Sequence, residues 1–240
     1  MFLSGLLNLS AQVTVYTWSG LAQDEYLYTA GNGVNNTAPA NVSSVDTTGI
    51  TNALTNTQLV FGTTGITYAN YYTLYVNRLT ISGNVMGYQL EGAYETTHVG
   101  SGEVVYAPAN PVTSSLDGGL QLEANQTWDV QSGTLFIADD FSDTTSNYTI
   151  TKTGAGSLLF DNSNQDWSGG RVLSGGRTVA YAEFDSSLFE PVVSEVLGTG
   201  TLTFNGGTLV AATQAGSGYA LMLGGLTLAG LRWRRRPNRA

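Results

Sequence analysis

Short runs in which apolar and polar residues alternate recur along most of this chain. Four of them are VTVYTW (13–18), YTLYVNRLTISG (72–83), WDVQSGTLFIA (128–138) and GTLTFNGGTLVA (200–211). Each run predicts a half-buried strand of about four to six residues. The segments between them are rich in Gly, Asn and Ser, which favour tight turns. A helical period of about 3.6 residues is not convincing anywhere between 12 and 212. The segment 183–197 is the one place for a short helix, and Pro191 limits it. The pattern predicts an all-β fold.

A Thr- and Gly-punctuated motif repeats in the second half of the chain. It runs through YTITKTGAGSLLF (148–160), DWSGGRVLSGGRTVAYA (166–182) and VLGTGTLTFNGGTLVA (196–211). This motif resembles the passenger-associated repeat of autotransporters, and the resemblance covers roughly residues 118–212. The matching positions are Thr151, Lys152, Thr153, Gly154, Ala155, Gly156, Leu158, Trp167, Ser168, Gly169, Gly170, Gly175, Gly176, Leu197, Gly198, Thr199 and Gly200. The resemblance implies a right-handed parallel β-helix, a solenoid in which each turn stacks on the one before it.

The strand pattern agrees with that implication. A period of about 20–25 residues per turn gives about four turns between residues 118 and 212. The candidate inward-facing residues are Leu158, Phe160, Val172, Leu173, Val179, Leu202, Phe204 and Leu209. Residues 13–117 match the repeat poorly, so we expect an irregular β region there, either turns with insertions or an N-terminal cap. A β-sandwich is the alternative architecture, and the KTGAGSL unit argues against it.

The most apolar run of the chain, YALMLGGLTLAGLRWRRR (219–236), stands directly before a cluster of arginines. As a helix its apolar part would span roughly 21 Å, less than the ~30 Å of a bilayer's hydrocarbon core. The run resembles the PEP-CTERM sorting signal, which implies membrane anchoring and an exosortase-type sorting enzyme as partner. The Pro-Glu-Pro triplet of that signal is missing, and ATQAGSG stands in its place. A buried amphipathic helix is the alternative. The residues assigned to this tail are Tyr219, Leu221, Leu223, Leu226, Leu228, Leu231, Trp233, Arg234, Arg235 and Arg236.

The N-terminus, MFLSGLLNLSAQVTV, begins with a short apolar run from Phe2 to Leu9. It resembles the end of a secretory signal peptide without the positively charged part, and an ordinary first strand is the equal alternative. The chain is therefore divided into a candidate signal remnant (1–12), an irregular β region (13–117), the repeat (118–212), and a tail with a short hydrophobic helix (213–240).

Composition narrows the classes of function. The 18 acidic residues exceed the nine basic ones, and five arginines lie in the tail, so the rest of the chain is strongly acidic. Such a surface repels nucleic-acid backbones, which makes nucleic acid an improbable partner. With one histidine and no cysteine, a zinc site is nearly excluded, and disulfides and thiol chemistry are absent.

Few residues are candidates for chemistry. The lone His98 is expected to be a surface histidine, because its neighbour Ser101 lacks the setting of a catalytic nucleophile. Three acids, Asp139, Asp140 and Asp143, could bind Ca²⁺ but favour a solvated loop. The carboxylate pairs Asp161/Asp166 and Glu183/Asp185 have no spacing that marks a glycosidase.

Two tyrosines, Tyr71 and Tyr72, lie in a tyrosine-rich stretch and are candidate glycan contacts, with ordinary strand residues as the alternative. We predict no catalytic residue, no metal ligand and no cofactor. The sequence favours an exported, surface-associated structural or adhesin-like protein in the envelope or extracellular matrix of a Gram-negative-type bacterium. The rival functions are an extracellular glycan-binding module and a polysaccharide-active enzyme on a β-helix.

Overall fold

The computed structural model describes residues 12–22, 24, 26–40, 45–62, 68–71, 73–82, 89–138, 141–143, 146–160, 167–185, 190–192 and 197–213. Most of the candidate signal remnant, residues 1–11, lies outside them. The sorting tail from 214 onward, with all its assigned residues, lies outside them as well.

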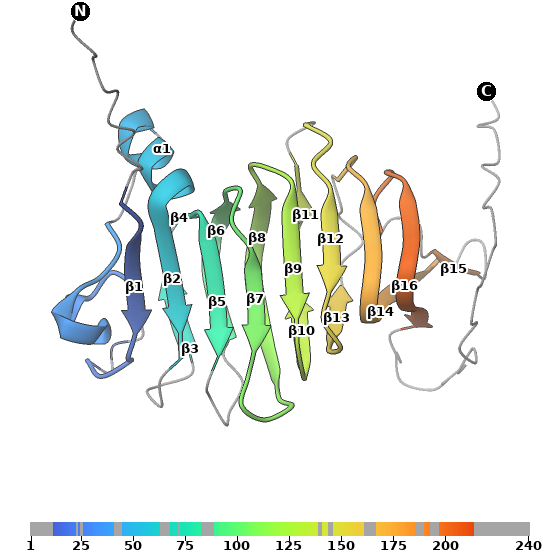
Figure 1. The fold of residues 1–240 in the computed structure, drawn as a ribbon, viewed down its shortest axis with the longest axis horizontal. Coiled ribbons are helices and arrows are strands. Elements are labelled where there is room, and N and C mark those ends of the chain that lie inside the picture. The colour runs from blue at the N-terminus through green and yellow to red at the C-terminus, as the bar shows by residue number, and fades with distance from the viewer. Residues whose placement is uncertain are drawn as a thin grey trace, which may run out of the picture.

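The chain folds into a β-solenoid whose strands are almost all parallel. Its first face is drawn in Figure 1 as a row of strands side by side along the long axis. In order they are β1 (Thr14–Trp18), β2 (Thr57–Phe61), β5 (Arg78–Ser82), β7 (Val104–Ala107), β9 (Gln126–Val130), β12 (Ile150–Thr153), and the first parts of β14 (Arg171–Asp185) and β16 (Leu202–Thr213). One turn takes about 24 residues where Val104 pairs with Trp128.

Two further faces are formed by strands of some of the turns. The second face holds β3 (Tyr68–Tyr71), the first parts of β6 (Gln89–Val99) and β8 (Thr113–Leu122), β10 (Thr134–Ile137), β13 (Ser157–Phe160), and the later parts of β14 and β16. The third face holds β4 (Leu74–Val76), the ends of β6 and β8, and β11 (Phe141–Ser142). Only β15 (Glu190–Val192) pairs antiparallel among the described strands, against the end of β14.

These pairings confirm the predicted parallel β-solenoid, and the alternative of a β-sandwich was wrong. Between residues 118 and 212 the first face carries four successive strands, β9, β12, β14 and β16. Residues 13–117 contribute β1, β2, β5 and β7 to the same face, so they extend the same stack.

Inward side chains stack in columns from turn to turn. One column on the first face runs through Leu59, Leu79, Val104 and Trp128, which are register partners in sequence and all nearly inaccessible to solvent. Aromatic rings add to the core where the faces meet. The ring centroids of Phe141 lie 5.9 Å from Trp128, 6.2 Å from Phe160 and 4.9 Å from Trp167. This continuous core holds the turns in register.

The expectation that 183–197 is the one place for a helix between 12 and 212 was wrong. The helix α1 (Thr47–Asn56) and two short 3₁₀ helices, η1 (Ala30–Asn32) and η2 (Val34–Asn36), interrupt the first turns. The helix α1 begins where the Asp46 carboxylate accepts a hydrogen bond from the Gly49 N–H at 2.8 Å. It buries only Ala53, and its apolar side consists of just Ile50, Ala53 and Leu54, too short a stripe to predict a helix from the sequence.

The one segment that was admitted as a helix contains strand in its described part. Glu183–Asp185 ends β14 and pairs with β15, which spans Glu190–Val192. Among the described residues, no helix is long and apolar enough to cross a membrane.

Most of the predicted inward residues of β13 and β14 are confirmed, and one is wrong. Leu158, Phe160, Leu173 and Val179 are buried. Val172 faces outward, because the alternation along β14 turns its neighbours Arg171 and Leu173 into the core. On β16, Leu202 and Leu209 are half-buried and Phe204 is 42% exposed, and within the described residues β16 pairs only with β14.

The two ends of the solenoid differ. At the N-terminal end, the loop after β1 folds back over the first turn, burying Trp18 and Leu27. The Tyr28 hydroxyl of that loop donates a hydrogen bond to the Thr73 carbonyl at 2.7 Å. At the other end, β16 pairs within the described residues only with β14. The inner side chains of β16 are therefore the least covered part of the stack.

Candidate functional site

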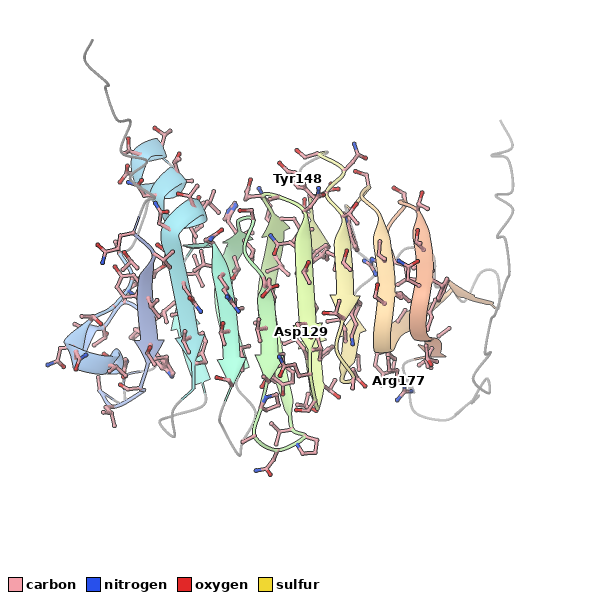
Figure 2. The ribbon with its side chains drawn as sticks, in the orientation of Figure 1. Asp129, Tyr148 and Arg177 are labelled. Atoms are coloured by element: carbon pink, nitrogen blue, oxygen red, sulfur yellow. The ribbon has the colours of Figure 1, made fainter. Side chains whose placement is uncertain are left out.

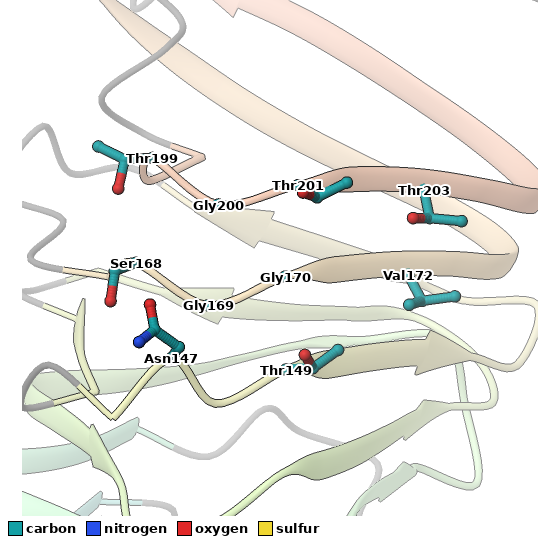
Figure 3. Close-up of a pocket in the computed structure, with 10 residues that line it drawn as sticks. All are labelled: Asn147, Thr149, Ser168, Gly169, Gly170, Val172, Thr199, Gly200, Thr201 and Thr203. Atoms are coloured by element: carbon teal, nitrogen blue, oxygen red, sulfur yellow. The ribbon is translucent and has the colours of Figure 1, made fainter.

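An open hollow of about 450 Å³ lies on the outside of the last turns, across the starts of β12, β14 and β16 (Figure 3). Its polar side chains come from Asn147, Thr149, Ser168, Thr199, Thr201 and Thr203. Glycines and Val172 form the remainder of the lining, and none of the lining residues is charged. A neutral surface rich in hydroxyl groups can exchange hydrogen bonds with an uncharged polyol.

Glycines let the turns approach one another below this hollow. A Cβ placed on Gly169 would lie 1.7 Å from the carbonyl oxygen of Tyr148. One on Gly200 would lie 1.6 Å from the carbonyl oxygen of Gly169. No side chain fits at either position, so the glycines of the SGG and GTG motifs are required by the stacking itself. The floor of the hollow is consequently bare backbone.

The buried Asp143 carboxylate binds two residues that line this hollow, Ser168 and Gly169. Its Oδ2 accepts hydrogen bonds from the backbone N–H of Gly169 at 2.9 Å and of Ser168 at 3.2 Å, and the Ser168 hydroxyl donates to the same oxygen at 3.2 Å. The side chain is fully buried. The expectation of a solvated loop was therefore wrong for Asp143, whose carboxylate joins one turn to the next.

The Ca²⁺ alternative gains no support in the described part of the chain, where no three His, Asp or Glu residues are grouped to hold a metal ion. The other two acids of that cluster, Asp139 and Asp140, lie outside the described residues.

Two cations are buried in the core, and the sequence interpretation missed both. Arg171 is 3% exposed, and its guanidinium carbon lies 3.9 Å from the ring centroid of Trp167 and 4.4 Å from that of Phe160. Such cation–π contacts are strongest where water is excluded. Burial lowers the pKa of Arg171. The Trp167 indole is itself fixed, since its Nε1–H donates to the Tyr148 carbonyl at 2.8 Å.

Lys152 is the second buried cation, and it is 1% exposed. Its Nζ lies within hydrogen-bond distance of four carbonyl oxygens, those of Thr153 at 2.8 Å, Gly154 at 2.9 Å, Gly156 at 2.8 Å and Gly175 at 3.1 Å, and its three protons are shared among them. Burial lowers the pKa of Lys152 to about 8, and the charge of Asp129 opposes this shift. The ammonium group thus satisfies the corner carbonyls of two successive turns, which is the physical reason for a lysine in the KTGAG motif.

The environment of Asp129 shows how the outer face differs from this interior. Asp129 lies on the outward side of β9, where it accepts hydrogen bonds from Thr153 Oγ1 at 3.2 Å and from Gln131 Nε2 at 2.7 Å. Figure 2 labels it together with Tyr148 near the upper corner of the turns and Arg177 near the lower one. Arg177 is exposed, in contrast to the two buried cations.

His98 is not the exposed surface histidine that was expected. Its side chain is 15% exposed, and its Nδ1 lies 2.7 Å from Glu123 Oε1. Its ring stacks on Tyr75 with centroids 4.4 Å apart. The sequence neighbour Ser101 directs its hydroxyl to Asn77 Oδ1 at 3.5 Å. The histidine therefore ties adjacent turns of the third face together.

The remaining candidates are described only partly or not at all. Tyr71 ends β3, and its partner Tyr72 lies outside the described residues, as do Asp161 and Asp166. Glu183 and Asp185 belong to the end of β14, where they pair with Val192 and Glu190. The glycan contact at Tyr71 and Tyr72 stays a prediction.

The alternation of residues along the strands already places Lys152 and Arg171 on the inner side. In ITKT, residues alternate between the two sides of a strand, so Lys152 shares its side with the apolar Ile150. The same alternation in RVL places Arg171 on the side of Leu173. The pattern did not show what would stabilise a buried charge. The backbone carbonyls around Lys152 and the aromatic rings beside Arg171 meet these side chains only when the turns stack.

Comparison with known protein families, curated proteins and solved structures finds no match to this chain.

Proposed function

We propose that this chain is an exported, surface-associated structural or adhesin-like protein of autotransporter-passenger type, and that its solenoid is right-handed. It would be sorted or anchored in the cell envelope through its PEP-CTERM-like tail. Its partners would be the membrane, an exosortase-type enzyme and extracellular polysaccharide.

The single observation that carries the proposal is a stack of turns with a continuous core and a polar outer face. Register pairing aligns the outward residues Thr127, Thr151, Val172 and Thr203 in one row over successive turns. Inside, one apolar core runs through the same turns, and on the first face its columns also hold the buried side chains of Gln126, Lys152 and Arg171. Such a unit presents a long, regular surface, and stacked repeats of this kind suit binding along an extended face.

The charge of this outer surface supports an extracellular setting. The body is acidic, and two of its four cations, Lys152 and Arg171, are withdrawn into the core. The acidic groups therefore dominate what the described turns present to solvent. A net charge far from zero keeps a protein soluble and disfavours self-association of the exposed faces.

The test is fractionation of the native producer cells followed by intact-mass measurement. We expect the protein in the envelope or extracellular fraction, with the tail either retained in a membrane fraction or cleaved before Arg232. Recovery from the cytosol with an intact arginine terminus would refute the proposal.

The hollow on the last turns favours one second candidate, a module that binds neutral glycans. Retention on a carbohydrate array would support it if Thr201→Val together with Thr203→Val weakened retention and Thr127→Val did not. Loss of retention on replacing Tyr71 and Tyr72 by Ala would instead place the glycan contact on β3. A polysaccharide-active enzyme predicts turnover of a glycan, and uniform silence in a hydrolysis and lyase screen would remove that alternative.

A further inference from the structure

The C-terminal end of the solenoid exposes side chains whose register partners in the preceding turn are buried. Leu173 on β14 is 3% exposed, whereas its register partner Phe204 on β16 is 42% exposed. Arg171 is likewise buried, and its partner Leu202 is only half-buried. The inner columns therefore continue onto β16 and end there without a cover. The N-terminal end has its own covering loop, so the two ends are not alike.

The backbone of β16 is equally prepared for another strand. It runs parallel to β14 from Leu202 to Thr213, and within the described residues it has no partner on its far side. An open strand edge carries free N–H and C=O groups that pair readily with a further strand. A cover for this end must supply both a parallel strand and apolar side chains at alternate positions.

The chain itself contains such a segment one turn further on. Turns differ in length, with 24 residues from Val104 to Trp128 and 31 from Arg171 to Leu202. At a spacing of 24 residues, the sequence after β16 repeats its pattern: Leu202, Thr203, Phe204 and Gly206 are followed by Leu226, Thr227, Leu228 and Gly230. The LTFNG of β16 thus returns as LTLAG, with the apolar residues at the same alternate positions and threonine between them. The same offset places Trp233 opposite Leu209.

The length of the connection fits as well. Residues 212–225 would lead from the second face of β16 back to the first face. Earlier returns, from Phe160 to Arg171 and from Ile137 to Ile150, are made with slightly fewer residues. The segment can therefore reach its place without stretching.

We propose that residues 225–234 form one more turn on β16, with Leu226 and Leu228 over the open core and Thr227 beside Thr203 on the outer face. The apolar tail is then stored on the solenoid while the protein is in water. A lipid bilayer competes for the same side chains, because either location removes them from water. The inference goes beyond the proposed function: the segment assigned to sorting would also be the cap of the fold.

The test uses pairs of cysteines, since the natural chain has none. Neighbouring strands lie about 4.8 Å apart, within the Cα separation that a disulfide accepts. The pair Thr203→Cys with Thr227→Cys should therefore form an intramolecular disulfide under mild oxidation of the full-length protein in detergent-free buffer. The pair Val172→Cys with Thr203→Cys joins established register partners and serves as the positive control. The pair Thr151→Cys with Thr227→Cys is the matched negative control, being three strands or about 14 Å apart.

The proposal predicts rapid crosslinking of the 203–227 pair, at a rate comparable to the 172–203 pair and at least about tenfold above the 151–227 pair. Vesicles of phosphatidylethanolamine and phosphatidylglycerol should lower the yield of the 203–227 disulfide and leave the 172–203 disulfide unchanged. Adding Leu228→Asp should also abolish it, because a carboxylate would enter the core.

Equal crosslinking of the 203–227 and 151–227 pairs would overturn the proposal, and so would crosslinked dimers, which would assign the covering strand to a second copy. Crosslinking of the 172–203 pair without the 203–227 pair would overturn it too. That result would show that β14 and β16 are stacked and that no further turn packs on β16. None of these outcomes bears on export, which the fractionation experiment tests separately.

Discussion

Replacing Lys152 by Met removes the only lysine of the chain from the core of the solenoid. The ammonium group has three protons to share among the four corner carbonyls around it, and three hydrogen bonds from a charged group at about 1.5–2 kcal/mol each stabilise the fold by about 5 kcal/mol. Burial of its charge opposes this, because a pKa of about 8 instead of 10.5 corresponds to about 3 kcal/mol at neutral pH. The variant should therefore be destabilised by about 2 kcal/mol at pH 7.

The pH dependence of the free energy of unfolding reports the cost of burying the Lys152 charge separately from its hydrogen bonds. Between pH 8 and pH 10.5 the unfolded chain keeps the Lys152 proton that the folded protein has released. The free energy of unfolding of the wild type should consequently rise with pH in that window, by about 2 kcal/mol between pH 7.5 and pH 9.5. Above about pH 10 the free energy of unfolding should stop rising. Burial raises the pKa of Tyr106, so the unfolded chain loses the tyrosine proton before the folded protein does, and stability falls with further increase in pH.

Urea unfolding of three proteins at several pH values measures the effect. The wild type should gain stability from pH 7.5 to 9.5, and Lys152→Met should not. Arg177→Met removes an exposed cation on the outer side of β14, and this variant should keep the wild-type slope. A wild-type curve that is flat over this range, or a Lys152→Met curve that rises in parallel with it, would refute the assignment of a depressed pKa to the buried ammonium.

Three further substitutions probe the stacking of the turns, each by chemical denaturation. Asp143→Ala should lower the free energy of unfolding by about 3 kcal/mol, since it leaves buried N–H groups of the next turn without their acceptor; a loss below about 1 kcal/mol would contradict this. Gly200→Ala should cost at least about 3 kcal/mol or prevent folding, because its Cβ would overlap a carbonyl, whereas at Gly175 the nearest atom lies at 3.2 Å and the same change should cost less than about 1 kcal/mol. Phe160→Ala should cost about 3–5 kcal/mol, and Val172→Ala, on the outer side, less than about 1 kcal/mol; equal losses would mean that the inner and outer sides are misassigned.

The parallel stack was predicted from the resemblance of the Thr- and Gly-punctuated motif to a known repeat, while strand alternation and glycine spacing predicted the strands and the turns between them. Both signals are local, since a turn's period and its φ > 0 corners are fixed by neighbouring residues such as Gly154 and Gly176. The burial of Leu158, Phe160 and Leu173 followed from the same alternation. Such features are predictable because every turn repeats the same requirement.

Other features depend on residues that meet only after folding. Lys152 is inside because carbonyls of two turns converge on it, and Asp143 is inside because the N–H groups of Ser168 and Gly169 lie opposite. His98 is ordered by Glu123 from the next turn. No pattern within one strand indicates such partners. The helix α1 was missed for a different reason, since its apolar stripe consists of only Ile50, Ala53 and Leu54 within a threonine-rich segment.

The direction of the hydrogen bonds between turns has a mechanical consequence. In a parallel solenoid these bonds lie along the long axis, so a force pulling outward on the C-terminus loads the last strand pair before any other. The stack should then yield one coil at a time, lengthening by a turn's worth of chain at each step while the remainder keeps its shape. A cell-surface filament built in this way would extend under shear and recoil when the flow stops.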